Sequence, residues 1–158
     1  YFNDDKNTAL HKMKDGNAIW HRVGDLGWKD EQGRVWFCGR KSQRVVTDEG
    51  DLYTVATEKV FDDHPLIFRT ALVGPTVDGR ITPTLVVELE EGADEAQVLR
   101  ELEAMKGDEL KYPHAGCAQV ERFLIHEGLP VDIRHNAKIQ REQLRLWAEG
   151  LLAKGKAA

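Results

Sequence analysis

The chain has 158 residues, with 22 Lys and Arg against 27 Asp and Glu, which gives a formal net charge of -5. This length fits one ordinary domain, or one small domain and part of another. Hydrophobic residues make up 41% and charged residues 31% of the chain, which excludes a disordered, collagenous or disulfide-stapled protein. The acidic balance also excludes the broad basic face that general nucleic-acid binding needs, so no nucleic-acid partner is expected.

The cysteines and the hydropathy pattern bear on the cellular compartment. Cys38 and Cys117 lie far apart and belong to no CxxC or Cys/His cluster, so we expect reduced thiols and a cytoplasmic protein. No run of about 18 apolar residues occurs, so no membrane span is predicted. Because the chain opens at Tyr1 within a polar, helix-like stretch and shows no signal peptide, we interpret it as a fragment of a longer protein.

The first forty residues predict a short helix followed by short strands. Residues 1–14 are polar and helix-like, with a turn after them. Aromatic and β-branched runs at residues 18–23 and 34–39 are typical of strands. Between these runs, residues 29–34 predict a hairpin turn in which Gly33 takes the left-handed conformation.

A polar stretch follows Arg40 and indicates a domain boundary. Residues 44–47 and 52–55 then predict two strands that pair around a turn. Thr57 is a suitable N-cap for a short helix. This helix should end at His64–Pro65, because proline disfavours helical geometry in the residue before it.

The rest of the chain mixes strands and helices. Residues 67–73 and 82–89 are the strongest strand candidates, and residues 121–126 predict another strand. Asp94 predicts the cap of a helix with one apolar face, and residues 140–152 predict a closing helix. The apolar face of the first helix comprises Val98, Leu99, Leu102 and Met105. This mixture lacks regular βαβ alternation and predicts a compact α+β domain.

Motifs of several common enzyme classes are absent from the sequence. There is no GxxxxGK[ST] phosphate loop, no GxSxG elbow and no HExxH helix. The six histidines share no metal-ligand spacing. We therefore predict no metal site in this chain.

Three stretches carry polar side chains that suit a nucleotide. A Gly-Asp turn after the run at residues 18–23 exposes the carboxylate of Asp25 at the end of a strand, where it can accept hydrogen bonds from a ribose diol. The run at residues 34–39 ends beside Arg40, whose guanidinium can donate to ribose or phosphate oxygens. A loop in residues 130–141 places Lys138 directly ahead of the last helix.

In this order and at these separations, the stretches resemble the late motifs of the adenylate-forming superfamily of acyl-CoA synthetases, peptide-synthetase adenylation domains and luciferases. The family pattern is (Y/W)xRxGDxG, a GRxD or GRxK hinge, VYPxEVE before an HP turn, and a GKxxRxxL loop. The matching residues are His21–Leu26, Gly39–Arg40, Tyr53–Glu58 with His64–Pro65, and Ala137–Leu144. The resemblance covers essentially the whole chain.

The resemblance implies an α+β fold, namely the C-terminal lid domain of an adenylate-forming enzyme, with small mixed sheets flanked by helices. The last β-hairpin segment of the large N-terminal domain would precede it. The resemblance assigns residues 1–40 to the incomplete end of the large AMP-binding domain, residues 41–43 to a hinge and residues 44–158 to the mobile lid. Ser42 occupies the hinge position, where a plain linker serine is the equal alternative.

The resemblance also implies roles for single residues. Asp25 should hold the ribose hydroxyls of ATP, and Arg40 should contact the same ribose or the adjoining phosphate. Lys138 should neutralise charge between the carboxylate and the α-phosphate as the adenylate forms. His135 either contacts substrate or phosphate beside this lysine or bonds to the backbone of its own loop, and Glu58 should be structural. The Mg²⁺-binding glutamate and the phosphate-gripping loop of the family lie upstream, so the fragment itself should be inactive.

Departures from the family pattern narrow the range of reactions that we expect. Val46 stands where many thioester-forming members have lysine, and residues 48–50 replace the usual border of the pantetheine tunnel. We therefore do not expect CoA to be used. Three segments resemble the OleC-type β-lactone synthetases of bacterial olefin biosynthesis more specifically: residues 36–42, 68–74 and 130–139.

This narrower resemblance implies an ATP-dependent closure of a long-chain 2-alkyl-3-hydroxy fatty acid to a β-lactone, with other olefin-biosynthesis enzymes as partners. Two alternatives remain open. One is an ordinary fatty acyl-CoA or acyl-AMP ligase, and the other is a non-catalytic α+β interaction module. Exposed apolar edges in residues 1–40 would also favour homo-oligomers of the fragment.

Overall fold

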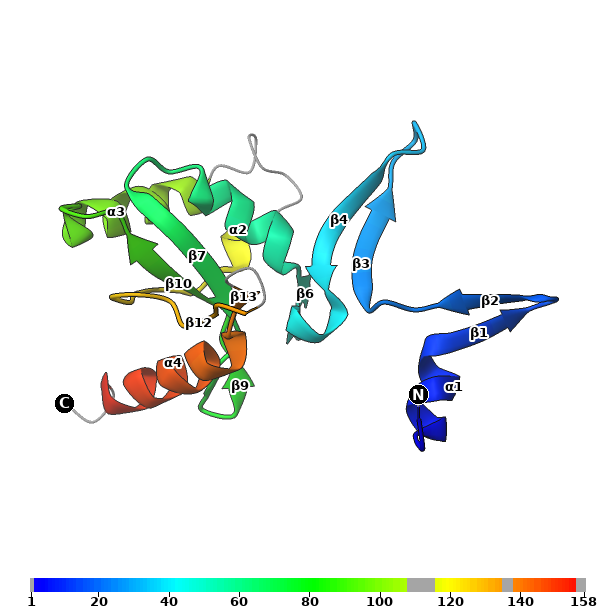
Figure 1. The fold of residues 1–158 in the computed structure, drawn as a ribbon. Coiled ribbons are helices and arrows are strands. Elements are labelled where there is room, and N and C mark those ends of the chain that lie inside the picture. The colour runs from blue at the N-terminus through cyan, green and yellow to red at the C-terminus, as the bar shows by residue number, and fades with distance from the viewer. Residues whose placement is uncertain (1, 108–115, 135–137, 156–158) are drawn as a thin grey trace. The chain divides into compact units, whose positions relative to one another are not determined.

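A computed structural model describes residues 2–107, 116–134 and 138–155 of the chain. The chain divides into two compact units, Tyr1–Ser42 and Gln43–Ala158. Each unit has its own helices and strands, which Figure 1 labels in chain order. None of the described helices is both long and apolar enough to span a membrane.

The first unit begins with a short helix and a β-hairpin. Asp4 caps helix α1 (Asp5–His11) by accepting a hydrogen bond from the backbone N–H of Asn7, at 3.0 Å. Strands β1 (Lys12–Asp15) and β2 (Ala18–His21) follow and pair antiparallel. The helix predicted for residues 1–14 is therefore wrong beyond His11, because the backbone of β1 bonds to the neighbouring strand instead.

A second hairpin completes the regular structure of this unit. Strands β3 (Asp25–Lys29) and β4 (Val35–Arg40) pair antiparallel. Gly33 in the connecting turn has a φ of 81°, so the predicted left-handed position is confirmed. The carboxylate of Asp30 fixes the same turn by accepting hydrogen bonds from the backbone N–H and the guanidinium of Arg34.

The second unit is built on a three-stranded sheet. Strand β10 (Thr84–Leu89) lies in the centre, antiparallel to β7 (Ile67–Val73) and parallel to β11 (Arg122–Ile125). The predicted strand at residues 67–73 is confirmed over its full length. Strand β10 begins just after Pro83, since proline cannot donate to the strand ladder.

Three helices cover the two faces of this sheet (Figure 1). Helices α2 (Thr54–Asp62) and α3 (Glu95–Lys106) pack on one face, and α4 (Arg141–Gly155) packs on the other. Side chains alternate along the strands, so Leu72 contributes to the first core and Ala71 to the second. The helix predicted to follow Asp94 is confirmed, and Val98 and Leu102 on its apolar face are fully buried. The second core includes Leu129, Leu144 and Ala148.

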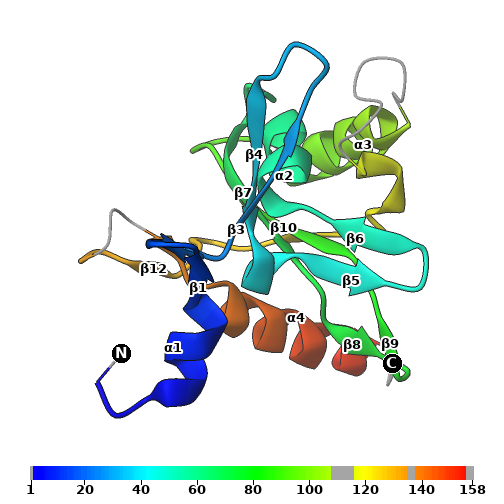
Figure 2. The ribbon, with the colours of Figure 1, turned by 90° about the vertical axis from the view of Figure 1, so that its right-hand side faces the viewer.

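Short hairpins and turns connect these elements. The described pairs are β5 (Val45–Thr47) with β6 (Gly50–Leu52), β8 (Thr76–Val77) with β9 (Arg80–Ile81), and β12 (Val131–Asp132) with β13 (Lys138–Ile139). A 3-10 turn at Cys117–Gln119 precedes β11. Figure 2 shows α4 running toward the β8–β9 hairpin, where the carboxylate of Glu149 accepts a hydrogen bond from the N–H of Thr76 at 2.8 Å.

The start of α2 differs from the sequence prediction. The strand predicted for residues 52–55 ends at Leu52, and the helix begins at Thr54 rather than after Thr57. Thr57 lies inside the helix and is fully buried. Packing explains the difference, because the earlier start lets Leu52 and Phe61 bury in the same core.

Candidate functional site

The open end of the β3–β4 hairpin holds the first pair of candidate residues. Asp25, the first residue of β3, lies directly opposite Arg40, the last residue of β4. The Oδ1 atom of Asp25 and the Nη1 atom of Arg40 are 2.9 Å apart, and the same Nη1 donates to the carbonyl oxygen of Val23 at 2.7 Å. Gly24 and Gly39 precede the two residues with positive φ angles of 80° and 116°, which a glycine adopts without strain.

This geometry corrects the expected placement of Asp25. Strand β2 ends at His21, so Asp25 opens a strand rather than following the end of one. Its carboxylate pairs with Arg40 because antiparallel register brings the two ends of the hairpin together. The side chains of Asp25 and Arg40 are 37% and 48% exposed. A hydroxyl or an anion from solution can therefore reach both groups.

A shallow cleft of about 360 Å³ runs along the same hairpin. Asp25 lies at one end of its lining, and Trp28 and Phe37 contribute aromatic surface. The indoles of Trp28 and Trp36 stack with their ring centroids 6.0 Å apart. The cleft thus combines an acceptor carboxylate with apolar ring faces, a combination that suits a ligand with a polar and a flat apolar part.

Ser42 lies in the 3-10 turn Lys41–Gln43, directly after β4. The backbone N–H of Lys41 donates to the carbonyl of Gly24 at 2.9 Å and so closes the end of the hairpin. The division between the two compact units falls between Ser42 and Gln43.

Lys138 belongs to the second unit, as the first residue of β13. It lies opposite Asp132 in the β12–β13 hairpin and is exposed. The N–H of Gln140 donates to the carbonyl of Pro130 at 2.8 Å, which extends the pairing beyond the short strands. His135, the other candidate in this loop, lies outside the described residues.

The chain entering this hairpin is held by an ion pair on the sheet. Glu88 of β10 and Arg69 of β7 are register partners, and the Oε2–Nε distance is 2.7 Å. The same Oε2 accepts the N–H of Leu129 at 2.7 Å, and Arg69 donates to the carbonyl of Leu129 at 3.3 Å. Leu129 itself is buried. Both backbone polar groups of one residue are thus satisfied by side chains of the central sheet.

The chain leaving the hairpin is held by a second ion pair. The side chains of Glu58 in α2 and Arg141, the first residue of α4, are 9% and 17% exposed. Both terminal nitrogens of the guanidinium donate to the carboxylate, with 2.9 Å between Nη2 and Oε2. The N–H of Leu72 donates to the same carboxylate at 2.6 Å. Burial raises the pKa of Glu58 to about 7, although the charge of Arg141 opposes the shift.

The sequence motifs assigned Glu58 only a structural role, and they gave no indication of Arg69 or Glu88. Glu58 and Arg141 lie 83 positions apart in the chain, and Glu88 and Leu129 lie 41 apart. The one signal in the sequence was a carboxylate on an otherwise apolar helix face or strand. When such a carboxylate is buried, it needs a charged or hydrogen-bonding partner.

The described residues offer no cluster of three or more His, Cys, Asp or Glu side chains that could hold a metal ion. The candidate residues supply one carboxylate acceptor in Asp25, one guanidinium in Arg40 and one exposed ammonium group in Lys138.

No protein-family model matches the chain. An olefin beta-lactone synthetase of Xanthomonas campestris pv. campestris is 47% identical over 154 residues, which are 94% of this chain and 27% of that protein. A second olefin beta-lactone synthetase, from Stenotrophomonas maltophilia, is 46% identical over 160 residues, which are 98% of this chain and 28% of that protein. The chain thus spans just over a quarter of the length of these relatives.

A solved structure with a similar fold is ATP-bound MatB from Rhodopseudomonas palustris. Its TM-score is 0.71 at 25% identity, over 96% of this chain and 28% of that one. The matched part has the same mixed α+β architecture of small sheets and helices. The chain therefore belongs to the adenylate-forming superfamily, has the fold of the C-terminal portion of its members, and is similar in sequence to the olefin beta-lactone synthetases.

Proposed function

We propose that the chain is the C-terminal part of a ligase that uses ATP to adenylate a long-chain 2-alkyl-3-hydroxy fatty acid and closes it to a β-lactone. The observation that carries the proposal is the exposed Asp25–Arg40 pair, held at 2.9 Å at the end of a hairpin. The sequence similarity to olefin beta-lactone synthetases supports the choice of substrate class. A cytoplasmic location and contact with other enzymes of olefin biosynthesis belong to the same proposal.

In this proposal, residues 1–40 end the large AMP-binding domain and residues 44–158 form a mobile lid. Residues 41–43 form the hinge between them, with Ser42 at its centre. The division of the chain after Ser42 supports this assignment. A change of backbone angles in a few hinge residues would let the lid approach and leave the nucleotide.

Asp25 and Arg40 bind and orient the nucleotide. The Asp25 carboxylate accepts hydrogen bonds from the two ribose hydroxyls, which is the geometry that a carboxylate with two oxygens offers to a diol. Arg40 donates to the same ribose or to the adjoining phosphate through another guanidinium N–H, since both hydrogens of Nη1 bond to Asp25 and Val23. Their mutual ion pair holds both groups in place before the nucleotide binds.

Lys138 acts on the charge that develops during adenylation. A carboxylate oxygen of the acid attacks the α-phosphorus of ATP, and pyrophosphate leaves with the bonding electrons. Two negatively charged groups approach each other in this step, so an ammonium group between them stabilises the transition state. The 3-hydroxyl oxygen of the substrate then attacks the acyl carbon, AMP leaves, and the hydroxyl proton is released.

CoA has no place in this reaction. Val46 and the Asp48–Gly50 turn stand where thioester-forming members of the family have the residues that border the pantetheine tunnel. Val46 is half exposed on β5, so a lysine at this position would reach solvent. The Mg²⁺ ligands and the phosphate-gripping loop are expected upstream, so the 158-residue chain should not adenylate by itself.

The decisive experiment uses the full-length enzyme with ATP and a racemic 2-alkyl-3-hydroxy fatty acid, with and without CoA, and identifies the product by NMR. We expect a β-lactone without CoA. Lys138→Ala should lower the rate of adenylation by about 10²–10³-fold, and Asp25→Ala should raise the KM for ATP by on the order of tenfold. Lys59→Ala removes another exposed lysine, on α2, and should change neither quantity.

An acyl-CoA product would identify an ordinary acyl-CoA ligase and leave the nucleotide roles intact. Unchanged kinetics in both Lys138→Ala and Asp25→Ala would contradict the assigned site. A separate assay tests the isolated chain: ATP–pyrophosphate exchange above background would contradict its inactivity and reopen the possibility that it contains a complete site.

A further inference from the structure

The β12–β13 hairpin that carries Lys138 is attached to the core of its unit at both ends. On the entering side, Glu88 and Arg69 bond to the N–H and the carbonyl of Leu129. On the leaving side, Arg141 follows Lys138 by three residues and is bonded to Glu58. We define these two groups as the entry clamp (Arg69, Glu88) and the exit clamp (Glu58, Arg141).

The exit clamp joins three elements at one point. The Glu58 carboxylate belongs to α2, its guanidinium partner begins α4, and the N–H of Leu72 in β7 donates to the same carboxylate at 2.6 Å. A bidentate Arg–carboxylate pair fixes orientation as well as distance. The start of α4, and with it the end of β13, therefore has one defined position against the sheet.

The side chains of the exit clamp are buried, whereas the residue they hold in position is exposed. Glu58 and Arg141 are 9% and 17% exposed, but Lys138 points its long side chain into solvent. A lysine side chain carries several rotatable bonds, so a fixed backbone narrows the region that its ammonium group can reach. Rigid support of that backbone reduces the volume that the ammonium group samples.

We infer that Glu58 and Arg141 are positioning residues for Lys138, which set where its ammonium group stands when the adenylate forms. This inference rests on the proposed function, because it needs Lys138 to act in adenylation. In this inference the exit clamp makes no contact with the nucleotide and acts only through the backbone of β13. Weakening it should therefore lower kcat for adenylation and leave the KM for ATP unchanged.

The first test is Arg141→Lys in the full-length enzyme, with the release of pyrophosphate as the readout. Lysine keeps the charge but cannot make the two parallel hydrogen bonds to Glu58. We expect kcat for adenylation to fall by on the order of tenfold, since a misplacement of about 1 Å can cost up to about 10²-fold. Glu58→Gln, which keeps the shape and one acceptor oxygen, should give a smaller fall in the same direction.

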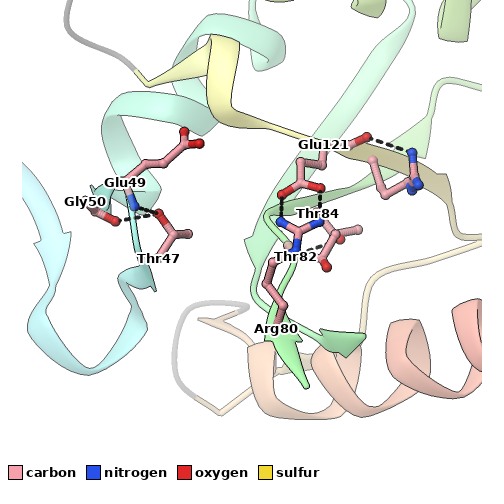
Figure 3. Close-up of polar contacts among 8 residues, drawn as sticks. Thr47, Glu49, Gly50, Arg80, Thr82, Thr84 and Glu121 are labelled. Atoms are coloured by element: carbon pink, nitrogen blue, oxygen red, sulfur yellow. Dashed lines mark hydrogen bonds and ion pairs between the residues drawn. The ribbon is translucent and has the colours of Figure 1, made fainter. Parts of the chain in front are cut away.

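A control with the same substitution is Arg80→Lys, in an ion pair whose side chains are more exposed, at 59% and 32%. Arg80 of β9 makes a bidentate ion pair with Glu121 (Figure 3), and the distance between Nη2 and Oε2 is 2.7 Å. The substitution is chemically identical to Arg141→Lys, but the pair supports no part of the Lys138 hairpin. Its kcat should equal that of the parent enzyme.

A double-mutant cycle separates positioning from general support of the fold. If the clamp acts only through Lys138, Arg141→Lys should have no further effect on the rate once Lys138 is alanine. If Arg141→Lys lowers the rate by the same factor with Lys138 present and with alanine at position 138, the inference is wrong and the role of Arg141 is purely structural. Loss of folded protein is checked separately by the unfolding midpoint of each variant.

The outcomes also distinguish this inference from the function on which it rests. If Lys138→Ala alone leaves adenylation unchanged, the proposed function fails and the clamp has nothing to position. If Lys138→Ala lowers the rate but Arg141→Lys and Glu58→Gln do not, only the positioning inference is wrong. A fall in kcat that disappears in the Lys138→Ala background supports both.

Discussion

The two units of the chain carry their candidate residues in different ways. In the described part of the first unit, residues 2–42, Cys38 is the one hydrophobic side chain that is buried. Asp25 and Arg40 are held there by hairpin register and by each other. In the second unit, ion pairs on a sheet with cores on both faces hold the chain before and after the hairpin that carries Lys138.

The two units therefore differ in how much buried surface stabilises them and in how firmly they hold their candidate side chains. A two-stranded hairpin without a core has little burial to oppose the loss of chain entropy. Exposed rings such as Phe37, at 55%, and Trp36, at 47%, contribute little to the first unit. A sheet covered on both faces can hold an exposed side chain in a defined place. We therefore expect the second unit to supply most of the free energy of unfolding.

The largest expected effect tests this division of stability. Phe61 is fully buried and its ring packs edge-on against that of Phe123, with 5.4 Å between centroids. Phe61→Ala should lower the free energy of unfolding by about 3–5 kcal/mol, because it removes apolar burial and leaves a cavity. Phe37→Ala, the matched change in the first unit, should cost below about 1 kcal/mol. Urea denaturation of both variants checks this, and equal losses would contradict the comparison.

A smaller effect depends on pH and concerns Glu58. Its pKa is raised from 4.5 to about 7 by burial, with Arg141 opposing and Asp62 adding to the shift. The folded state then binds the proton more tightly than the unfolded state, so this group stabilises most below pH 4.5. This contribution to the free energy of unfolding is at most about 3 kcal/mol, and it is lost as the pH rises to about 7.

Glu58→Gln should remove this part of the pH dependence. Urea unfolding at about pH 4.5 and about pH 7.5 should show a smaller decrease in the variant than in the parent chain. Other carboxyl groups with lowered pKa values, such as Glu121 and Glu142, lose their contribution on acidification. Both the parent chain and the Glu58→Gln variant contain these groups, so their contributions cancel when the two proteins are compared. An unchanged slope would show that the pKa of Glu58 is not raised.

A third prediction concerns close packing in the second unit. A Cβ atom on Gly74 would lie 2.9 Å from Cγ2 of Ile81 and 3.0 Å from Cγ1 of Val45. Gly74→Ala should therefore cost about 1–3 kcal/mol of unfolding free energy, the usual range for overpacking. The double variant Gly74→Ala/Ile81→Val keeps the Cγ2 methyl of residue 81, which is in close contact. The double variant Gly74→Ala/Ile81→Ala removes that methyl. Each double variant is compared with its own Ile81 single variant, and a smaller cost of Gly74→Ala in the Ile81→Ala background than in the Ile81→Val background confirms the contact.

The last prediction concerns the turn of the β3–β4 hairpin in the first unit. Gly33 has a φ of 81° and its Cβ would meet only the side chain of Lys29, at 3.5 Å. Gly33→Ala thus creates no severe clash, but it places a side chain in the left-handed region at a cost of about 1–2 kcal/mol. Gly33→Asn should cost less, because asparagine tolerates that region better. Amide hydrogen exchange of the β3–β4 hairpin should detect the loss, and alanine and asparagine variants of equal protection would contradict it.

Local patterns predicted the elements that local interactions define. The strand at residues 67–73 and the helix capped by Asp94 are present because alternation, spacing and a capping carboxylate act within a few residues. The same reasoning failed at residues 52–55 and 12–15, where neighbouring elements decide the backbone. Helix α2 begins early to bury Phe61, and the chain after α1 extends to pair with β2.

The order and spacing of the motifs, the turn at Gly33 and the apolar face of α3 could be predicted from the sequence, since these follow from residues close together in the chain. The pairing of Asp25 with Arg40 and of Glu58 with Arg141 could be found only in the folded chain. The partners of the second pair lie 83 positions apart. Their contact depends on the burial of both faces of the sheet, which is a property of the whole unit and of no single segment.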